Sequence, residues 1–357
     1  MRKVITIAGA GIAGLTAAIN LRKAGIPVRV FEKRSEVGAR FDGDYQCMEN
    51  WLTDEDGLDF WRRVGIEVTF PVLPERSVTA YDAAGRQYHY GSDGTLGYVV
   101  RRGGMGDCLD QHLKQQAIGL GAEVILGEGL PPESADVVAT GPGRPLVLLQ
   151  GITFRTQLKD AIHIIFSRRL APGFYAYLTA MSGNGFVCSA RTRSRKAGRH
   201  LLDDTVAKFH EFLDFEMAAP RHFANCGVSR PIWNHRKIIV GEAAGFQDTL
   251  WGFGMRYAFL SGHLAARAIA KGGDYWAMVR SQIAPSVRAS MVNRMLTDIT
   301  GDAGYWALLH LMRWHGDLRL FLRYHYRPRL WKLALYPLAA AHVLPQFRYH
   351  PRRKGVR

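Results

Sequence analysis

The sequence is poor in the residues that build metal centres and disulfide frameworks. Its 357 residues contain only four cysteines, which lie far apart and form no Cys-x-x-Cys pair: Cys47, Cys108, Cys188 and Cys226. This spacing argues against structural zinc and disulfide staples, and it is typical of a reducing cytosol. The 13 histidines lack metal-ligand spacing, and no Ser/His/Asp or Cys/His constellation is recognisable. We therefore expect no metal site.

Long hydrophobic runs are also absent. The apolar stretches near the C-terminus are interrupted by Lys332 and Pro337, whereas a membrane-spanning helix needs about 20 apolar residues in succession. The chain opens with Met1, Arg2 and Lys3 directly before the strand-like VITIAGA, so we expect no signal peptide and a cytoplasmic location. A hydrophobic content of 47% is ordinary for a globular core, and the length allows two domains or one domain with an insertion.

The first 32 residues carry a glycine pattern in a recognisable context. Gly9, Gly11 and Gly14 form Gly-x-Gly-x-x-Gly between strand-like and helix-like segments, and Glu32 ends the next strand-like segment. Such glycines permit a tight turn, close approach of a pyrophosphate and helix–strand packing. The acid accepts hydrogen bonds from ribose hydroxyls and repels a 2′-phosphate. The pattern predicts a Rossmann-type dinucleotide site and disfavours NADP, with a plain parallel-sheet turn as the alternative.

Further along, nucleotide-binding and β-rich segments alternate. Residues 70–100 predict a β-hairpin that turns near Ala84 and Gly85, and residues 151–190 are rich in strand-forming residues. Strand-to-glycine units return in ADVVATGP and RKIIVGEAAG. We therefore predict an α/β fold, in which a β-rich substrate domain is inserted into a discontinuous Rossmann-type domain. The predicted ranges are 1–70, 100–150 and 235–300 for the Rossmann-type domain, 71–99 and 151–234 for the substrate domain, and 301–357 for a basic, aromatic, helical C-terminal segment.

A second glycine-rich stretch, GEAAGFQDTLWGFGMRYAFLSGHLAARAI, begins at Gly241. One interpretation is an ordinary turn before a core helix; the other is a backbone that lies against a large flat ligand. In the second interpretation, Glu242 bonds a ribityl chain. Gly252 and Gly254 then let the next helix direct its N-terminal amides at a flavin ring, where they stabilise the negative charge of the reduced form.

The order of these motifs resembles FAD-dependent oxidoreductases of the geranylgeranyl reductase family, within the p-hydroxybenzoate-hydroxylase-type superfamily. The resemblance rests on the first glycine motif, the acid, a following arginine, the ATG strand and GEAAGFQD, and it covers residues 1–300. Two positions depart from the family pattern, because Glu242 replaces the usual Asp and Thr249 replaces a common Pro. The resemblance implies FAD as the cofactor and a substrate domain over the flavin. The residues expected at FAD are Gly9, Gly11, Gly14, Glu32, Arg40, Arg102, Gly241, Glu242, Gly252, Phe253 and Gly254.

A strand-like aromatic stretch indicates an apolar or aromatic small-molecule substrate. Tyr175 and Tyr177 in PGFYAYLTAMSGNGFV stand where the reductases carry an aromatic motif, and alternate residues of a strand share a face. With Cys47 and Trp251 they are our candidates for the substrate pocket. Core packing of the tyrosines and an inert buried thiol are the alternatives. The Trp-x-Trp-x-Ile-Pro motif of flavin halogenases is absent, so we do not expect halogenation.

Positive charge is concentrated near the C-terminus. The last 48 residues hold eleven Lys or Arg and one Asp, in a chain of net charge +16. Arg319, Arg323 and Arg327 recur every four residues and so share a helix face, with tryptophans on either side. Such a basic, aromatic segment is typical of membrane-surface binding, so an anionic membrane is one partner predicted for residues 305–357. A helical cap with solvated arginines and an anionic partner protein are the alternatives; no motif supports nucleic acid.

Three functions are compatible with this sequence. The leading one is an FAD-dependent reductase of carbon–carbon double bonds in an isoprenoid or other apolar substrate. The second is a flavin monooxygenase that hydroxylates an aromatic group on a small molecule or peptide, and the third is a flavin-binding membrane or assembly factor without turnover. Because a fold is shared by many reactions, fold alone cannot decide among them. The electron donor is open, since the chain has no second Gly-x-Gly-x-x-Gly motif.

Overall fold

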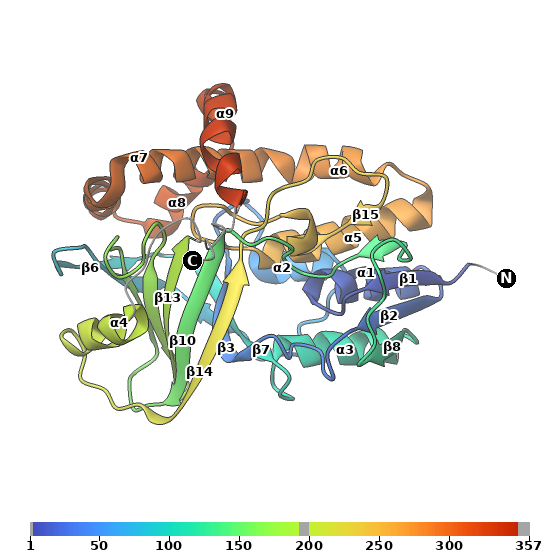
Figure 1. The fold of residues 1–357 in the computed structure, drawn as a ribbon, viewed down its shortest axis with the longest axis horizontal. Coiled ribbons are helices and arrows are strands. Elements are labelled where there is room, and N and C mark those ends of the chain that lie inside the picture. Colours follow the sequence, from blue (N-terminus) through green and yellow to red (C-terminus); the bar gives the residue numbers. More distant parts are fainter. Residues whose placement is uncertain (1–2, 193–199, 349–357) are drawn as a thin grey trace, which may run out of the picture.

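A five-stranded parallel sheet carries the first glycine motif in the computed structural model, which describes residues 3–192 and 200–348. The strand order is β15 (Ile238–Ile239), β9 (Val137–Val138), β1 (Ile5–Ala8), β2 (Val28–Glu32) and β8 (Glu123–Leu126). Figure 1 shows this sheet at the N-terminal side of the molecule, with α1, α3 and α5 beside it. The strands are short and apolar because both faces of a parallel sheet are covered by helices.

Helix α1 (Ile12–Lys23) begins directly after the glycine turn and packs against α5 (Met255–Lys271) and α3 (Leu109–Gly119). A side chain at Gly262 of α5 would lie 2.3 Å from the carbonyl oxygen of Ala13. Small residues therefore allow α1 and α5 to approach closely, which explains the Ala- and Gly-rich composition of the segment after Met255.

The second layer is a seven-stranded mixed sheet that takes strands from two separate parts of the chain. All pairs are antiparallel except β5 with β11. A three-stranded antiparallel sheet in the order β3, β7 and β4 adjoins it. The mixed sheet runs in the order β14 (Ala218–Gly227), β10 (Val147–Arg155), β13 (Asn184–Thr192), β12 (Ala176–Met181), β11 (Ala161–Ile165), β5 (Ser77–Tyr81) and β6 (Gln87–Gly91). The small sheet comprises β3 (Asp42–Glu49), β7 (Gly97–Gly103) and β4 (Leu73–Glu75), and α2 (Gly57–Arg63) and α4 (Leu201–His210) complete these layers.

The predicted α/β fold is confirmed, with a Rossmann-type domain, a β-rich insertion and a helical C-terminus. The predicted hairpin is also present, because β5 and β6 pair and the chain turns between them. The exact domain boundaries remain a prediction.

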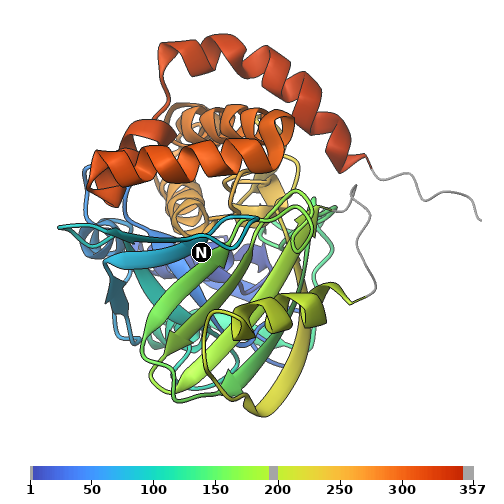
Figure 2. The ribbon, with the colours of Figure 1, turned by 90° about the vertical axis from the view of Figure 1, so that its left-hand side faces the viewer.

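Helices from the C-terminal part lie over both sheets. They are α6 (Tyr275–Gln282), α7 (Ala284–His315), α8 (Leu318–Tyr326), α9 (Leu330–Val343) and a short 3₁₀ turn, η2 (Leu344–Phe347). In Figure 2, α9 lies across the outer side of α7, away from the mixed sheet. Apolar side chains of α7 and α8, among them Leu309 and Phe321, share a buried cluster with Tyr88 and Tyr90 of β6. Across the described residues, no helix is both long and apolar enough to cross a bilayer.

A kink divides α7 at Gly301, where φ is +61° and ψ is −141°. This conformation lies outside the helical region and favours glycine. Arg168, which lies between β11 and β12, holds the kink. Its backbone N–H donates to Asp302, and its guanidinium donates to the carbonyl oxygen of Asp298. The second half of α7 therefore takes a direction of its own.

From the sequence, Arg319, Arg323 and Arg327 were considered to face a membrane or solvent. The structure shows that each of them also bonds to another part of the chain. Arg319 donates from Nε to the carbonyl oxygen of Asn50 at 2.8 Å, and both Arg323 and Arg327 pair with Asp54. All three arginines, with Arg327 as the C-cap of α8, therefore bond to residues 50–54, and the pairs with Asp54 lie at the surface, where the Asp54 side chain is 76% exposed. The sequence pattern identified a common helix face correctly but could not reveal the acidic loop that the face contacts.

Asp317 provides a test of how α8 is held. Its carboxylate accepts from the N–H of Leu320 at 2.9 Å as the helix cap, and from the N–H of Asp93 and the hydroxyl of Ser92 beyond β6. We expect Asp317→Ala to lower the free energy of unfolding by about 2 kcal/mol, because both the cap and the tether are lost. Urea denaturation would measure this. The matched control is Asp93→Ala, which removes the same charge without the cap, and an equal loss in both variants would contradict the assignment.

Candidate functional site

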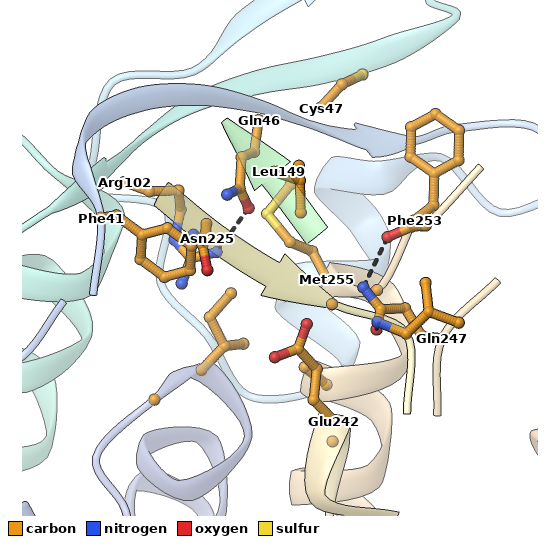
Figure 3. Close-up of a pocket in the computed structure, with 18 of the residues that line it drawn as sticks. Phe41, Gln46, Cys47, Arg102, Leu149, Asn225, Glu242, Gln247, Phe253 and Met255 are labelled. Carbon is orange, nitrogen blue, oxygen red and sulfur yellow. Dashed lines mark hydrogen bonds between the residues drawn. The ribbon is translucent and has the colours of Figure 1, made fainter. Parts of the chain in front are cut away.

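One large cavity lies between the parallel sheet, the mixed sheet and the C-terminal helices. Its volume is about 580 Å³, and it reaches from the glycine turn after β1 to side chains of α7 and α8. All residues that the sequence analysis assigned to cofactor or substrate line this cavity, except Gly14. Figure 3 shows part of the lining, with Phe41 and Arg102 on one side, Gln247 and Phe253 on the other, and Glu242 between them.

The glycine turn combines two packed positions with one open position. Gly9 has φ of +103°, and a Cβ there would lie 2.3 Å from the carbonyl oxygen of Ala139; a Cβ at Gly14 would lie 2.1 Å from the carbonyl oxygen of Gly9. Gly11 is different, because a Cβ there would meet no atom within 4 Å. Gly9 and Gly14 thus serve packing, whereas the space above Gly11 suits a phosphate group at the N-terminus of α1.

Glu32 lies beside this turn at the end of β2. Its Oε2 accepts from the N–H of Ala10 at 3.0 Å, and its Oε1 accepts from the N–H of Arg34 at 3.1 Å. The first turn of α1 contains no acidic side chain that would compete with a phosphate. The arrangement therefore fits a dinucleotide, with the ribose near Glu32 and the pyrophosphate at the helix N-terminus.

The two residues assigned to FAD from opposite ends of the sequence, Arg40 and Glu242, form an ion pair in the cavity. Arg40 also donates to the side-chain oxygen of Asn225 at 2.7 Å and to the carbonyl oxygen of Cys226. Arg40 precedes β3, Asn225 belongs to β14, and Glu242 belongs to the 3₁₀ turn η1 (Gly241–Ala244). Three distant segments therefore meet at the centre of the cavity. The sequence pattern identified both charged residues but not their pairing.

Arg102 of β7 has its donors engaged by the protein. Its guanidinium bonds both oxygens of Asp110 at 2.8 Å and the side-chain oxygen of Gln46 at 2.9 Å. It also lies over the ring of Phe41, with 4.1 Å from Cζ to the ring centroid. Asp110 in the first turn of α3 is buried, so the pair is shielded from water. Arg102 holds Gln46 and Phe41 in position at the cavity wall, and a direct contact with FAD remains a prediction.

The loop at residues 247–254 is shaped by Asp248. Its carboxylate accepts from the N–H groups of Leu250 at 3.1 Å and Trp251 at 2.7 Å. The neighbouring Gln247 donates to the carbonyl oxygen of Gly252 at 2.8 Å and accepts from the N–H of Val228. These bonds fix the loop that lines the cavity before α5.

Because Gly252 and Gly254 have no side chain, the backbone of this loop can lie close to neighbouring groups. Gly252 has φ of +80°, and Gly254 is the N-cap of α5, whose first turn contains no acidic residue. The first N–H groups of a helix have no partner within it. Because Gly254 and Met255 line the cavity, α5 directs its positive end toward the space expected for the flavin ring. Thr249, which replaces the family's common Pro, bonds Ser290 of α7 through both its N–H and its hydroxyl.

The other end of the cavity, which we call the substrate lobe, is lined by β5, β6, β11, β12, α7 and α8. Among the described residues of these elements that line it, none is charged. Tyr175, just before β12, donates its hydroxyl to the carbonyl oxygen of Trp251 at 2.7 Å and so connects this lobe to the loop before α5. Burial raises the pKa of both Tyr175 and Tyr177, which keeps their phenols protonated. The lining from these elements is Ser77, Val78, Ala80, Tyr90, Ile162, Ile164, Tyr177, Thr179, Met312, Leu318 and Leu322.

Cys47 on β3 lines the same cavity. Burial, with the nearby charges of Glu49 and Glu75, raises the pKa of its thiol. A thiol that keeps its proton is a poor nucleophile. Cys47 is therefore better suited to pack against a substrate than to form a covalent bond with one.

Several lining residues were not found from the sequence. Gln46, Asn225 and Gln247 are polar residues without a motif, and nothing in the sequence places β3, β14 and η1 together. Met312 and Leu322 belong to helices that the sequence analysis treated as a separate segment. Their apolar spacing was visible, but only the tertiary structure reveals which side of α7 and α8 faces the cavity.

Comparisons with known proteins agree with this architecture. Residues 7–44 match the NAD(P)-binding Rossmann-like domain family, and a sequence search of curated proteins found no match. A geranylgeranyl bacteriochlorophyll reductase-like protein from Thermoplasma acidophilum superimposes with a TM-score of 0.69 at 16% identity, over 96% of this chain and 98% of that one.

Two further solved structures have the same fold. The flavin-dependent brominase Bmp2 gives a TM-score of 0.62 at 16% identity, over 96% of this chain and 98% of that one. A variant of 2-methyl-3-hydroxypyridine-5-carboxylic acid oxygenase gives 0.52 at 16% identity, over 87% and 93%. At this identity the likeness establishes the fold alone. The chain has the fold of FAD-dependent oxidoreductases, with a Rossmann-like dinucleotide-binding domain, and the resemblance inferred from the sequence is confirmed at the level of the fold.

Gly11 allows cofactor binding to be separated from folding. We expect Gly11→Val to weaken FAD binding by at least about tenfold, because the new side chain fills space that only a ligand uses. The loss of stability in the cofactor-free protein should stay near about 1 kcal/mol, since the backbone at Gly11 is extended and only a weak helix cap is lost. Quenching of flavin fluorescence on titration and thermal melts of the cofactor-free protein would measure the two effects.

Gly9→Ala is the control for this test. Its added methyl group meets the carbonyl oxygen of Ala139 on a positive-φ backbone, so it should destabilise the protein even without cofactor. If Gly11→Val bound FAD like the wild type, the phosphate site at Gly11 would be wrong.

Glu49, near the cavity on β3, generates a prediction on pH. Its carboxyl is buried, and neither oxygen has a hydrogen-bond partner among the described residues. Burial raises its pKa from 4.5 to about 7, although Arg256 opposes this with an Nε–Oε1 distance of 4.0 Å. The folded-state pKa lies above the unfolded one, so the contribution of Glu49 to the stability of the protein is greatest below pH 4.5. This contribution is lost as the pH rises through 7.

We expect the difference in unfolding free energy between Glu49→Gln and the wild type to shift with pH. From the pKa change, the shift should favour the variant by up to about 3 kcal/mol between acidic and mildly alkaline pH. Urea denaturation across that range would measure it. Glu123→Gln, at a largely exposed carboxylate, is the control, and a pH-independent difference for Glu49→Gln would contradict the prediction.

Proposed function

We propose that this protein is an FAD-dependent oxidoreductase that reduces carbon–carbon double bonds of an isoprenoid or other apolar substrate. The observation that carries the proposal is the division of the cavity. The glycine turn and Glu32 occupy one end, the Arg40–Glu242 pair lies between, and the substrate lobe occupies the other end. The lining of that lobe from β5, β6, β11, β12, α7 and α8 is uncharged, and Glu75, which accepts from the N–H of Ser77, lies beside it. A substrate with a carboxylate or phosphate near its reacting end would find no counter-charge in that lobe.

Bound FAD would supply the hydride that adds to one alkene carbon. The chain itself has to hold the substrate against the flavin ring, exclude water and deliver a proton to the other alkene carbon. The thiol of Cys47 and the phenol of Tyr177 both line the cavity and both carry a proton. They are our candidates for the proton donor. Tyr175 is a positioning residue, because its hydroxyl is already bonded to the Trp251 carbonyl oxygen.

A flavin monooxygenase is the second candidate. The hydroxyls of Tyr177 and Thr179 on β12 give the substrate lobe polar atoms that would orient a phenolic ring, and one protein with the same fold is an oxygenase. In the reductase the product gains two hydrogens without oxygen, whereas a monooxygenase adds one oxygen atom and needs dioxygen.

We further propose a cytoplasmic protein that binds at a membrane surface, because an apolar substrate of this kind resides in lipid. The electron donor is an external reductant. No second dinucleotide turn was found in the sequence, so a nicotinamide donor would have to bind transiently.

An anaerobic single-turnover experiment tests the reaction. FAD on the protein is reduced with dithionite and mixed, without oxygen, with a polyprenyl alcohol in detergent. The oxidised-flavin absorbance should return as the substrate gains two hydrogens, which mass spectrometry detects. If the flavin stays reduced without oxygen, and dioxygen then adds one oxygen atom to an aromatic substrate, the monooxygenase is correct.

A pocket variant completes this test. We expect Ile164→Lys to slow reoxidation by at least about tenfold, because a charge in the apolar lobe disfavours the substrate. FAD binding should remain, since Ile164 lies on β11, outside the glycine turn. The control Ile118→Lys places the same charge at an exposed position of α3, and equal slowing in both variants would argue against this lobe as the substrate site.

A further inference from the structure

Helix α9 exposes an apolar face without any charged residue. Leu330 is 86% exposed, Leu338 is 62% exposed and Trp331 is 46% exposed. At 100° per residue the exposed apolar positions span about 160° of the helix surface, and the exposed His342 widens this arc to about 180°. The one charged residue of the helix, Lys332, is buried on the opposite side. The exposed apolar residues are Leu330, Trp331, Leu333, Ala334, Pro337, Leu338 and Ala341. His342, which is also exposed and lies 3.2 Å from Asp298, borders them.

The neighbouring helix α8 also exposes two apolar or aromatic side chains. Leu320 and Tyr324 are both about half exposed, on the side of α8 away from its buried residues. The guanidinium of Arg329, just before α9, lies 3.5 Å from the ring centroid of Tyr324 and so links the two helices. We call the exposed apolar residues of α9 together with Leu320 and Tyr324 the outer face.

Cations flank the outer face. At the C-terminal end of α9, a hollow of about 280 Å³ is lined by Arg230, Arg348, Ala340, Ala341, Leu344 and Pro345. Both arginines are exposed, and none of the described residues that line the hollow is acidic. Ala341 belongs both to the hollow and to the outer face. An apolar strip thus runs directly into a site with two guanidinium groups, which matches the chemistry of a phospholipid: acyl chain beside phosphate.

We propose that the outer face docks on an anionic lipid bilayer, with α9 lying in the interface and Arg230 and Arg348 binding lipid phosphate. Apolar and aromatic side chains on one face of a helix, with cations beside them, are typical of helices that lie in a membrane interface. A second copy of this chain fits less well, because two outer faces would bring like charges together in a protein of net charge +16. This assignment differs from the sequence analysis, since the arginine row of α8 contacts the protein and takes no part.

The inner sides of the same helices line the substrate lobe. Leu318 and Leu322 of α8 face the cavity, while Leu320 and Tyr324 belong to the outer face. Docking would therefore bring the wall of the substrate lobe within one helix of the bilayer. A bilayer lipid is then the substrate source, a conclusion that also depends on the proposed reaction.

Vesicle flotation with the FAD-loaded full chain tests the docking surface without any need for turnover. The probes are phosphatidylcholine vesicles with and without phosphatidylglycerol. The wild type should bind the anionic vesicles at least about tenfold more tightly than the neutral ones, and less tightly at high salt. The double variant Leu330→Glu/Leu338→Glu should lose at least about tenfold on anionic vesicles. Arg230→Gln/Arg348→Gln should lose about tenfold on anionic vesicles and little on neutral ones.

Two controls keep the result interpretable. Ile118→Glu/Leu126→Glu adds the same charges at exposed apolar positions elsewhere and should float like the wild type. Leu330→Ser/Leu338→Ser adds no charge, and its binding should fall between the wild type and the glutamate variant. Circular dichroism and FAD titration confirm that each variant is folded.

Three outcomes would overturn the proposal. The first is a wild type that does not float with anionic vesicles, and the second is an α9 variant that floats like the wild type. The third is a lipid-free dimer, detected by light scattering, that the α9 substitutions convert to a monomer. Because flotation is independent of turnover, failure of docking and failure of the proposed reaction give different results.

Discussion

The ion pair between Arg40 and Glu242 joins the separate parts of this protein at one point. Each side chain is 23% exposed, and Arg40 also reaches Asn225 and the Cys226 carbonyl oxygen on β14. A charge in this position is costly unless its partners are in place. The parallel sheet, the mixed sheet and the loop before β3 therefore have to assemble together.

The same pair divides the cavity chemically. On the side of the glycine turn, backbone N–H groups, Glu32 and the N-terminus of α1 suit a polar, phosphorylated ligand. On the other side, aromatic and aliphatic side chains from β11, β12 and α8 suit an apolar one. Asp248 and Tyr175 maintain the boundary, since one shapes the loop before α5 and the other bonds the Trp251 carbonyl oxygen.

Local patterns in the sequence identified lining residues on both sides of the cavity, but not the contacts that bring distant segments together. Gly9, Gly11 and Gly14 act through backbone geometry over a few residues, so their roles follow from spacing. The partners of Arg40 and the arginines of α8 are more than 180 and 260 residues away, respectively, and no periodicity encodes such contacts. The arginine row was correctly assigned to one helix face. The direction in which these arginines point depends on Asp54, an acidic loop residue that no sequence pattern singles out.

The kink at Gly301 sets the direction of the second half of α7, which carries Met312 to the wall of the substrate lobe. Arg168 fastens this joint from the substrate side, and no residue of the joint lines the cavity. The lobe can therefore be reshaped independently of the cofactor. A change of backbone angle at residue 301 would move Met312 and the wall of the substrate lobe that it forms, and would leave the glycine turn and Glu32 in place.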